Sequence, residues 1–451
     1  MRINAMAILV LAALCCGFAT AELQQVEVGG SLRIRGNYFN MDSLGKYSFI
    51  EQRTRLNVKA DFTDDVSAFI EFDYYNMWGE DFRSNYLTGA DFRSSQFNDN
   101  DVALYQAYIR ADNLWGTPLS LRVGRQEFRL GNAFFIGTQE SSAFFYGMSY
   151  DAILLTYAHE QFVLNAVTAK TFERYGDFMK DDADLYGVYF SYIGIEDVSL
   201  DAYWLYARDR VGALGNDDDI HLHTVGLRGA GVVNNFDFDV EGAYQFGSVH
   251  GIPNPWFRVF NREADVDFDE FGVNAELGYT FDVSWQPRVF GRFAYLGGGS
   301  PDRSWWSNDF DMPFIRLCSD LKYSEFFDND PRSPFKASLS NVFFYSLGLQ
   351  AAPTEALQLK LVGAYFEVDK RAADMGRWFW RNRAGKSLGW ELGVYADYHY
   401  SEDLTVRAGY AHFFGKRGLE RNNFLASGLQ PWGGDRRDDY DYLFIETEIR
   451  F

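Results

Sequence analysis

The stretch from Val102 to Gly131, VALYQAYIRADNLWGTPLSLRVGRQEFRLG, decides the fold. Apolar and polar residues alternate along its first part, stop at the Trp-Gly-Thr-Pro sequence of residues 115–118, and then alternate again. A period of two with one apolar face is typical of a β-strand, and Gly close to Pro marks a turn. One face of each strand suits hydrocarbon, whereas the other carries guanidinium and amide groups. The stretch therefore predicts a hairpin in the wall of a membrane barrel, with its polar face toward a wet lumen.

The alternation assigns the side chains of this hairpin to two faces. The residues expected to face lipid are Ala103, Tyr105, Ala107 and Ile109 in the first strand and Leu119, Leu121 and Val123 in the second. The residues expected to face the lumen are Gln106, Tyr108, Arg110, Arg122, Gly124 and Gln126. Arg125 lies near the end of the second strand, where the alternation does not fix its face.

The N-terminal residues predict export. Arg2 precedes an apolar run over residues 5–14, and Ala19-Thr20-Ala21 is a small-x-small cleavage site. Residues 1–21 are therefore expected to be a cleaved signal peptide and residues 22–451 an outer-membrane barrel.

The cysteines and the apolar runs give less support to a lipoprotein or a helical membrane protein than to a secreted barrel. Cys15 and Cys16 suggest a lipoprotein, but Leu14 stands where a small residue is expected before the modified cysteine. After cleavage Cys318 is the single cysteine, so no intramolecular disulfide is expected. Beyond the signal peptide no apolar run reaches the roughly 18 residues that a membrane helix needs.

The composition fits a barrel and argues against nucleic acid as a partner. The chain carries 42 basic and 63 acidic residues, for a net charge of −21, which repels phosphates. Aromatic residues make up 18% of the chain, although the mean hydropathy is only −0.26. An aromatic-rich chain that is hydrophilic overall is expected when roughly half of each strand faces lipid and half faces water.

Eighteen segments alternate in this way, and their connections differ in length. The segments are 25–40, 46–62, 66–78, 100–112, 119–127, 149–158, 162–172, 183–194, 198–209, 219–229, 235–247, 268–280, 286–296, 338–350, 356–368, 387–400, 404–414 and 440–451. Short turns such as 63–65 and 401–403 alternate with mostly longer polar stretches such as 79–99 and 297–337. The pattern predicts an all-β, membrane-spanning antiparallel barrel of about 18 strands, with short periplasmic turns and long extracellular loops.

The two chain ends support this fold class over a soluble β-sandwich, which also alternates. An even number of strands places both termini on the side of the short turns. The last strand puts Leu443, Ile445 and Ile449 on its apolar face and ends the sequence at Phe451, an aromatic end that barrel-insertion machinery is expected to recognise. A sandwich requires neither the asymmetric connections nor this terminal aromatic.

The sequence shows no constellation that predicts an enzyme, a cofactor or a metal centre. There is no nucleophile elbow, no zinc-ligand spacing and no glycine loop for phosphate. The acidic stretches 217–219 and 265–270 leave calcium binding between loops open, with a solvated face favoured because the calcium-loop pattern is missing.

The chemistry lies on the faces assigned to the lumen. The residues predicted to bind substrate there are Arg35, Arg53, Arg55, Arg110, Arg122, Arg125, Gln126, Arg228, Glu241, Arg292, Glu391 and Arg407. Arginine offers a planar fork of donors that suits carboxylates and sugars, and interleaved acids would keep the binding weak enough for conduction. The alternative for each residue is an ion pair that only stiffens the wall.

Two hairpins resemble those of the alginate export family. The first contains Tyr105-Gln106-Ala107-Tyr108-Ile109-Arg110, then Leu121-Arg122-Val123-Gly124-Arg125-Gln126-Glu127 and Gly131. The second contains Ser387-Leu388-Gly389-Trp390-Glu391-Leu392-Gly393-Val394, then Arg407-Ala408-Gly409-Tyr410 and Phe413-Phe414-Gly415. The resemblance implies an eighteen-stranded monomeric barrel in the outer membrane of a Gram-negative-type bacterium. It also implies an arginine-lined conduit for a polyuronate, and it leaves open a periplasmic export machinery as partner.

Three functional classes compete. The first is an outer-membrane channel for anionic or hydroxylated polysaccharide or oligosaccharide, and the second is a less selective diffusion porin for small solutes. An outer-membrane enzyme is the weakest, because it needs a catalytic constellation. A further hypothesis concerns residues 128–148, whose aromatic side chains are too apolar for a freely solvated loop. This loop is expected either to fold inward and narrow the pore or to pack on neighbouring loops.

Overall fold

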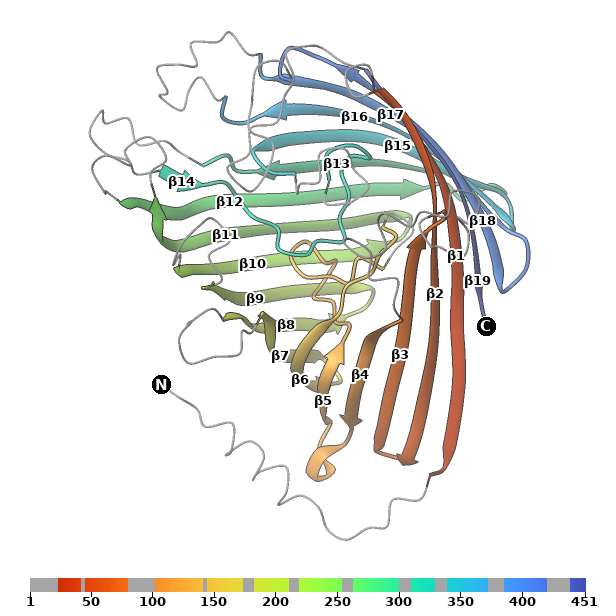
Figure 1. Cartoon of the computed structure of the whole chain (residues 1–451), viewed down its shortest axis with the longest axis vertical. Coiled ribbons are helices and arrows are strands. Elements are labelled where there is room, and N and C mark those ends of the chain that lie inside the picture. Colours follow the sequence, from red (N-terminus) through yellow and green to blue (C-terminus); the bar gives the residue numbers. More distant parts are fainter. Residues whose placement is uncertain are drawn as a thin grey trace.

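The chain folds into a closed antiparallel β-barrel in the computed structural model (Figure 1). The structure describes residues 23–41, 45–79, 102–140, 144–172, 182–210, 219–253, 263–299, 310–328, 339–371, 385–419 and 439–451. The predicted signal peptide, residues 1–21, lies outside the described residues. Within those residues, no helix is long and apolar enough to cross a membrane.

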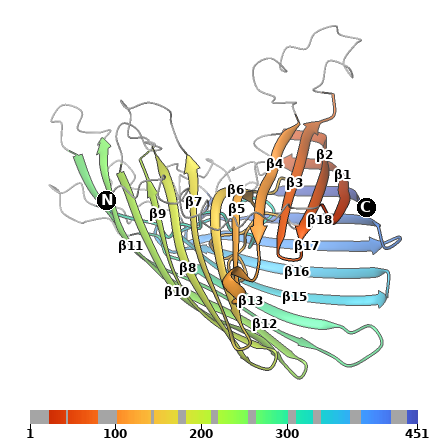
Figure 2. The ribbon, with the colours of Figure 1, turned by 90° about the horizontal axis from the view of Figure 1, so that it is seen from below.

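All eighteen predicted strands are confirmed, and they form the ring in sequence order (Figures 1 and 2). They are β1 (Gln25–Met41), β2 (Gly45–Thr63), β3 (Val66–Met77), β4 (Ala103–Ala111), β5 (Leu119–Gln126), β6 (Tyr150–His159), β7 (Phe162–Phe172), β8 (Ala183–Ile195), β9 (Val198–Asp209), β10 (Asp219–Val233), β11 (Phe236–Pro253), β12 (Glu263–Thr280), β13 (Arg288–Leu296), β15 (Val342–Thr354), β16 (Leu357–Val368), β17 (Ser387–His399), β18 (Leu404–Gly415) and β19 (Tyr440–Arg450). The short β14 (Phe310–Met312), which the alternation did not predict, pairs in parallel with β12.

The first and last strands close the ring. β1 pairs with β19 from Ser31 opposite Arg450 to Met41 opposite Tyr440, and the amide of Gly30 donates to the carbonyl of Phe451. Closure leaves none of the eighteen described wall strands at an open edge of the sheet, which a bilayer requires because it offers no water to free amides. Adjacent strands are joined alternately by short turns and by mostly longer connections, with the short link between β1 and β2 as an exception, as in outer-membrane barrels with periplasmic turns.

The outer face is apolar in the way that the alternation predicts. Ile109, Leu227, Leu347 and Ile445 expose 62%, 69%, 65% and 58% of their surface. Apolar side chains this exposed, repeated around a whole ring, would aggregate in water, whereas in a membrane they contact lipid.

The predicted faces of Ala103 and Tyr105 are wrong, because β4 contains a bulge. Glu71 of β3 pairs with Gln106, whereas the next residue, Phe72, pairs with Leu104, so Tyr105 is the extra residue. Its ring lies 3.8 Å from the Arg55 guanidinium carbon on the lumen side. Beyond the bulge the alternation is reversed, and Leu104 rather than Ala103 is on the lipid face, opposite Phe72.

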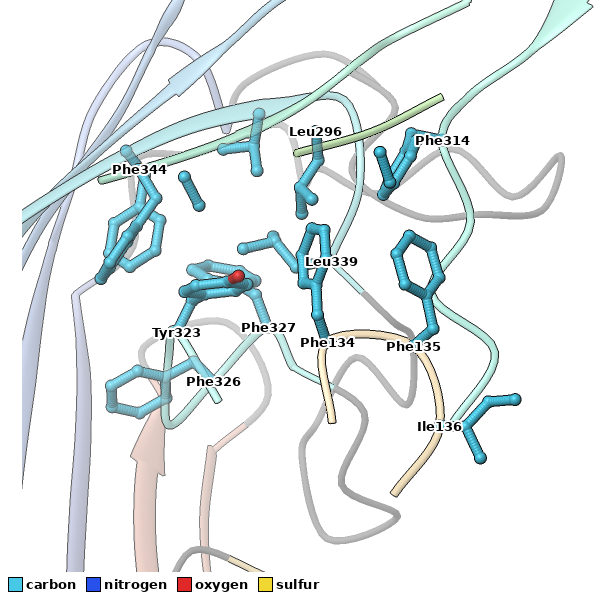
Figure 3. Packing of buried hydrophobic residues seen from close by; sticks show 14 of the residues in the cluster. Phe134, Phe135, Ile136, Leu296, Phe314, Tyr323, Phe326, Phe327, Leu339 and Phe344 are labelled. Carbon is cyan, nitrogen blue, oxygen red and sulfur yellow. The ribbon is translucent and has the colours of Figure 1, made fainter. Parts of the chain in front are cut away.

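Two connections fold into the ring and build an apolar core there. The first is the inward segment between β5 and β6, described over residues 127–140 and 144–149, and the second is residues 310–328 between β13 and β15. They meet at a bridge between Ile136 and Cys318. In Figure 3, Phe134 and Phe135 of the first segment face Phe314 and Leu339, and the rings of Phe135 and Phe314 are 5.4 Å apart.

Candidate binding site in the barrel lumen

Four arginines form a cluster on the lumen face of two adjacent strands. Arg33 and Arg35 come from β1, and Arg53 and Arg55 come from β2. Each pair is two residues apart, so both members point to the same side of the sheet. Arg33 lies directly opposite Arg53 in the strand register. Like charges placed opposite each other repel, so this arginine cluster requires anionic or carbonyl partners.

Glu446 of β19 supplies one of those partners. Its carboxylate lies 2.9 Å from Arg33, 2.5 Å from Arg35 and 2.8 Å from Arg407 of β18. The Glu446 side chain is completely buried. One carboxylate therefore links three guanidinium groups across the seam where the barrel closes.

The first inward segment supplies the other partners. Glu140 lies 2.6 Å from Arg53 and 2.9 Å from Arg55. Residues 144–148, here called the capping segment, lie over the same arginines. Its backbone carbonyls accept hydrogen bonds from the cluster in order: Phe144 from Arg33 at 2.7 Å, Phe145 from Arg53 at 2.7 Å and Tyr146 from Arg55 at 3.1 Å. The inward fold expected for residues 128–148 is thus confirmed for the described part of that loop.

An aromatic ring fills the space above the guanidinium groups. The Phe145 ring centre lies 4.8 Å from the guanidinium carbon of Arg33, 5.3 Å from that of Arg35 and 6.0 Å from that of Arg53. Cations at these distances from a ring face are attracted to its negative quadrupole. The capping segment and Glu140 thereby keep the cluster almost completely from solvent, with Arg53 exposed by only 1%.

Gly147 allows this close approach. Its φ is +79°, a region that favours glycine, and a Cβ there would lie 2.2 Å from Arg55 Nη2 and 2.8 Å from Glu140 Oε2. Any other residue at 147 would be strained at this φ and would require the Arg55 and Glu140 side chains to shift.

A cavity of about 300 Å³ lies beside the cluster, against β15–β19 and the second inward segment. Of the residues predicted to bind substrate, it is lined by Arg35, Arg292, Glu391 and Arg407. Its other charged lining residues are Lys322, Glu325, Lys360 and Asp397. Five cations and three acids therefore face this space.

Most of these charged groups form ion pairs with one another or hydrogen bonds with the second inward segment. Arg292 lies 3.2 Å from Glu276 and donates to the carbonyl of Lys322 at 3.3 Å. Glu391 accepts hydrogen bonds from the Ser324 hydroxyl at 2.6 Å and from the Glu325 amide at 3.1 Å. Lys360, in contrast, has no carboxylate within 4.0 Å among the described residues, which leaves its ammonium group available to a ligand in the cavity.

Arg228 and Glu241 lie on the wall formed by β9–β12. Arg228 pairs with Asp201 at 2.7 Å and with Asp239 at 2.8 Å. Glu241 is buried and accepts a hydrogen bond from the Tyr203 hydroxyl at 2.6 Å. These two residues therefore have partners within the wall and do not reach the cavity.

The remaining predicted residues separate into three environments. Arg110 is 51% exposed on the lumen face and lies 2.8 Å from Asp112. Arg122 donates to the carbonyl of Glu127 at 2.9 Å, and its neighbour Gln126 is completely buried and donates to the carbonyl of Ala152. Arg125 lies on the outer face, opposite Ala107 and paired with Asp151 at 2.8 Å, so its predicted lumen position is corrected.

Several partners at the site escaped the sequence prediction. Glu446 and Glu448 were detectable, because they alternate with the apolar Leu443, Ile445 and Ile449 on the last strand. Glu140 and Glu325 belong to irregular segments, where no period assigns a side chain to a face.

Glu127 is a titratable group just past the end of β5. It accepts a hydrogen bond from the Tyr105 hydroxyl. Burial raises the pKa of Glu127 to about 6, although the hydrogen bond from Tyr105 and the nearby Arg55 act in the opposite direction.

A closed eighteen-stranded ring with an apolar exterior, a charged lumen and inward-folded loops defines an outer-membrane channel. Residues 24–416 match the family model described as alginate export. The chain belongs to this family, and it is located in the outer membrane.

Several solved structures of Pseudomonas aeruginosa proteins resemble the chain. OpdL is 13% identical with a TM-score of 0.57, covering 95% of this chain and 99% of its own. OccK8 (OprE) is 14% identical with a TM-score of 0.55 and coverages of 94% and 98%. The outer membrane protein opdK is 12% identical with a TM-score of 0.52 and coverages of 94% and 98%. These likenesses show the fold alone. A comparison with curated proteins finds no match.

Proposed function

We propose that this channel conducts anionic or hydroxylated oligosaccharide or polysaccharide chains through its arginine-bearing lumen. The observation that carries the proposal is the arginine cluster, in which Arg33, Arg35, Arg53 and Arg55 gather on adjacent strands beside a cavity with further cations. Guanidinium groups bind carboxylates with a planar pair of donors and also donate to hydroxyl and ring oxygens. A uronate offers all three kinds of acceptor on one sugar.

The spacing of the sites supports a chain-like substrate. Arginines two residues apart on a strand are separated by about 7 Å, a distance of the same order as the repeat of an extended sugar polymer. Successive carboxylates are then able to pass from one site to the next. The acids Glu446, Glu391 and Glu325 among the cations keep each contact exchangeable, as conduction requires.

A second candidate function is a diffusion porin for small solutes, and the size of the cavity favours it. About 300 Å³ is at the lower limit of ligand pockets, enough for a small solute but not for an extended polymer. In this conformation the inward segments fill the space that a polymer would need. The two functions therefore differ in whether the inward segments move during transport.

Planar-bilayer conductance separates the two candidates. A polysaccharide channel is expected to show current block by uronic-acid oligomers that grows with oligomer length and weakens at high salt, since exposed charges are screened. A neutral oligosaccharide of equal length should block less. A current that small uronate monomers and long oligomers affect equally, or that neither affects, contradicts the polysaccharide proposal and leaves the diffusion porin.

Further features belong to the same proposal. We propose that residues 1–21 are removed on export, that the barrel works as a monomer in contact with outer-membrane lipid, and that periplasmic export machinery delivers the polymer. The site has no proposed role in catalysis: its charged groups are arranged to hold anions, and the family and fold are those of transport channels.

A further inference from the structure

The arginine cluster is already occupied by acceptors from the protein's own chain. Three consecutive carbonyls of the capping segment, at Phe144, Phe145 and Tyr146, each accept from a different arginine. Glu140 places its two carboxylate oxygens 2.6 Å and 2.8 Å from Arg53. These contacts join positions 87 to 111 residues apart in the sequence, so the barrel and not local chain geometry brings them together.

We infer that Glu140 and the capping segment act as an internal competitor that occupies the anion site of the channel until an anionic saccharide displaces it. This inference rests on the proposed function, because it concerns the same arginines and the same class of substrate. The resting channel is then autoinhibited, and a uronate chain opens it by competing for Arg53 and Arg55.

The groups that occupy the site match the parts of a uronate residue. The Glu140 carboxylate takes the position of a uronate carboxylate and forms the paired contact that a guanidinium prefers. The Phe145 ring is a six-membered ring lying over three guanidinium groups. The carbonyl oxygens take the place of sugar hydroxyls and ring oxygens as acceptors. A protein segment and a uronate residue therefore cannot hold these arginines at the same time.

Among the described residues, the wall neutralises Arg53 and Arg55 only in part. Glu446 is within hydrogen-bond reach of Arg33 and Arg35, but it is not paired with either β2 arginine. Asp73 lies 3.5 Å and Glu127 3.6 Å from Arg55, longer contacts than the 2.9 Å from Glu140. Displacement of Glu140 thus exposes positive charge, which attracts the anion that replaces it. The exchange of one carboxylate for another keeps the charge balance of the site constant.

Two substitutions weaken the competitor without altering an arginine. Glu140→Gln keeps the shape of the side chain but removes the charge that holds Arg53 and Arg55. Gly147→Ala strains the backbone at a φ of +79° and adds a methyl group 2.2 Å from Arg55 Nη2, so that the contacts between the capping segment and the cluster must shift. The matched controls are Glu160→Gln in the turn after β6 and Gly116→Ala in the turn after β4. Gly116 has a similar φ of +73° but nothing within 4 Å of the added Cβ.

The experiment measures block of single-channel current by a uronic-acid trimer and by a neutral trisaccharide, with heat-modifiable gel migration to verify folding. Glu140→Gln and Gly147→Ala are expected to raise the conductance and to lower the trimer concentration for half block by about tenfold, because the trimer no longer competes with a charge-assisted contact. The control variants should behave as the wild type.

Two results overturn the inference in distinguishable ways. If the trimer blocks wild type and both variants at the same concentration, the capping segment does not compete, although the proposed function stands. If the trimer blocks neither the wild type nor any variant, the arginine cluster is not a uronate site, and the proposed function fails together with the inference. Should Gly147→Ala fail to fold, Glu140→Gln alone decides between these outcomes.

Discussion

Glu446 provides the sharpest test of how the arginines are held. Glu446→Gln removes one buried negative charge that Arg33, Arg35 and Arg407 share at contacts of 2.5–2.9 Å. Loss of one partner from a buried ion pair costs about 3–5 kcal/mol. Because the amide oxygen of glutamine still accepts a hydrogen bond, we expect the lower value, a loss of about 3 kcal/mol in the free energy of unfolding. Because the substitution removes one negative charge beside the lumen, the current should also become more anion-selective.

Urea unfolding of the barrel in lipid vesicles, followed by tryptophan fluorescence, measures this loss. At a slope of about 3 kcal/mol per molar urea, the unfolding midpoint should fall by roughly 1 M. Glu355→Gln, in the exposed turn between β15 and β16, is the control and should leave the midpoint unchanged. Adding Arg35→Met to Glu446→Gln should recover part of the loss, since it restores the balance of charge at the seam. A midpoint within about 0.1 M of wild type, with unchanged selectivity, would refute the argument that Glu446 neutralises the seam.

Two further predictions concern the lumen wall and the inward segment. The double variant Arg110→Ala/Arg122→Ala should shift the reversal potential in a salt gradient toward cation selectivity. Arg125→Ala should leave the reversal potential unchanged, because Arg125 lies on the outer face. An equal effect of the double and the single variant would contradict the assigned faces. For Glu127, a pKa raised to about 6 means that the folded state binds more protons than the unfolded state between roughly pH 4.5 and 6. The free energy of unfolding is therefore expected to fall as pH rises through this window. Hydrogen exchange in residues 127–140, corrected for the intrinsic exchange rate, should accordingly become faster. Glu127→Gln should abolish this pH dependence, and an unchanged dependence in that variant would assign it to another group.

The strands were predictable because the membrane imposes their pattern. Lipid on one side and water on the other enforce a period of two, and strands such as β7 and β9 begin and end at the predicted residues. The pattern failed at Tyr105, where one extra residue in β4 shifts the faces without any change in composition. A bulge of this kind depends on the partner strand, so β4 alone carries no sign of it.

The candidate site was predictable only in part, because its other half comes from irregular segments. Alternation placed Arg53 and Arg55 on the lumen face correctly, but nothing in the sequence places Glu140 against them, since the contact to Arg53 spans 87 residues and follows from closure of the ring. The aromatic residues of the loop after β5 did indicate burial. They did not indicate which wall would receive them.

Position relative to the inward segments decides what each predicted arginine does. A guanidinium group that points into the lumen must either stay hydrated or find protein acceptors, because leaving it dry and unpaired is costly. Arg110, close to the turn before β5, stays 51% exposed beside Asp112, whereas Arg53, beneath the capping segment, is 1% exposed and fully engaged. Both residues are arginines on the lumen face of a β-strand, so the path of the loop accounts for the difference in their exposure. In the proposed function, a hydrated arginine such as Arg110 steers a passing anion, whereas a covered one such as Arg53 binds only after the capping segment is displaced. The loop that covers the cluster would then determine which arginines act at rest and which act during transport.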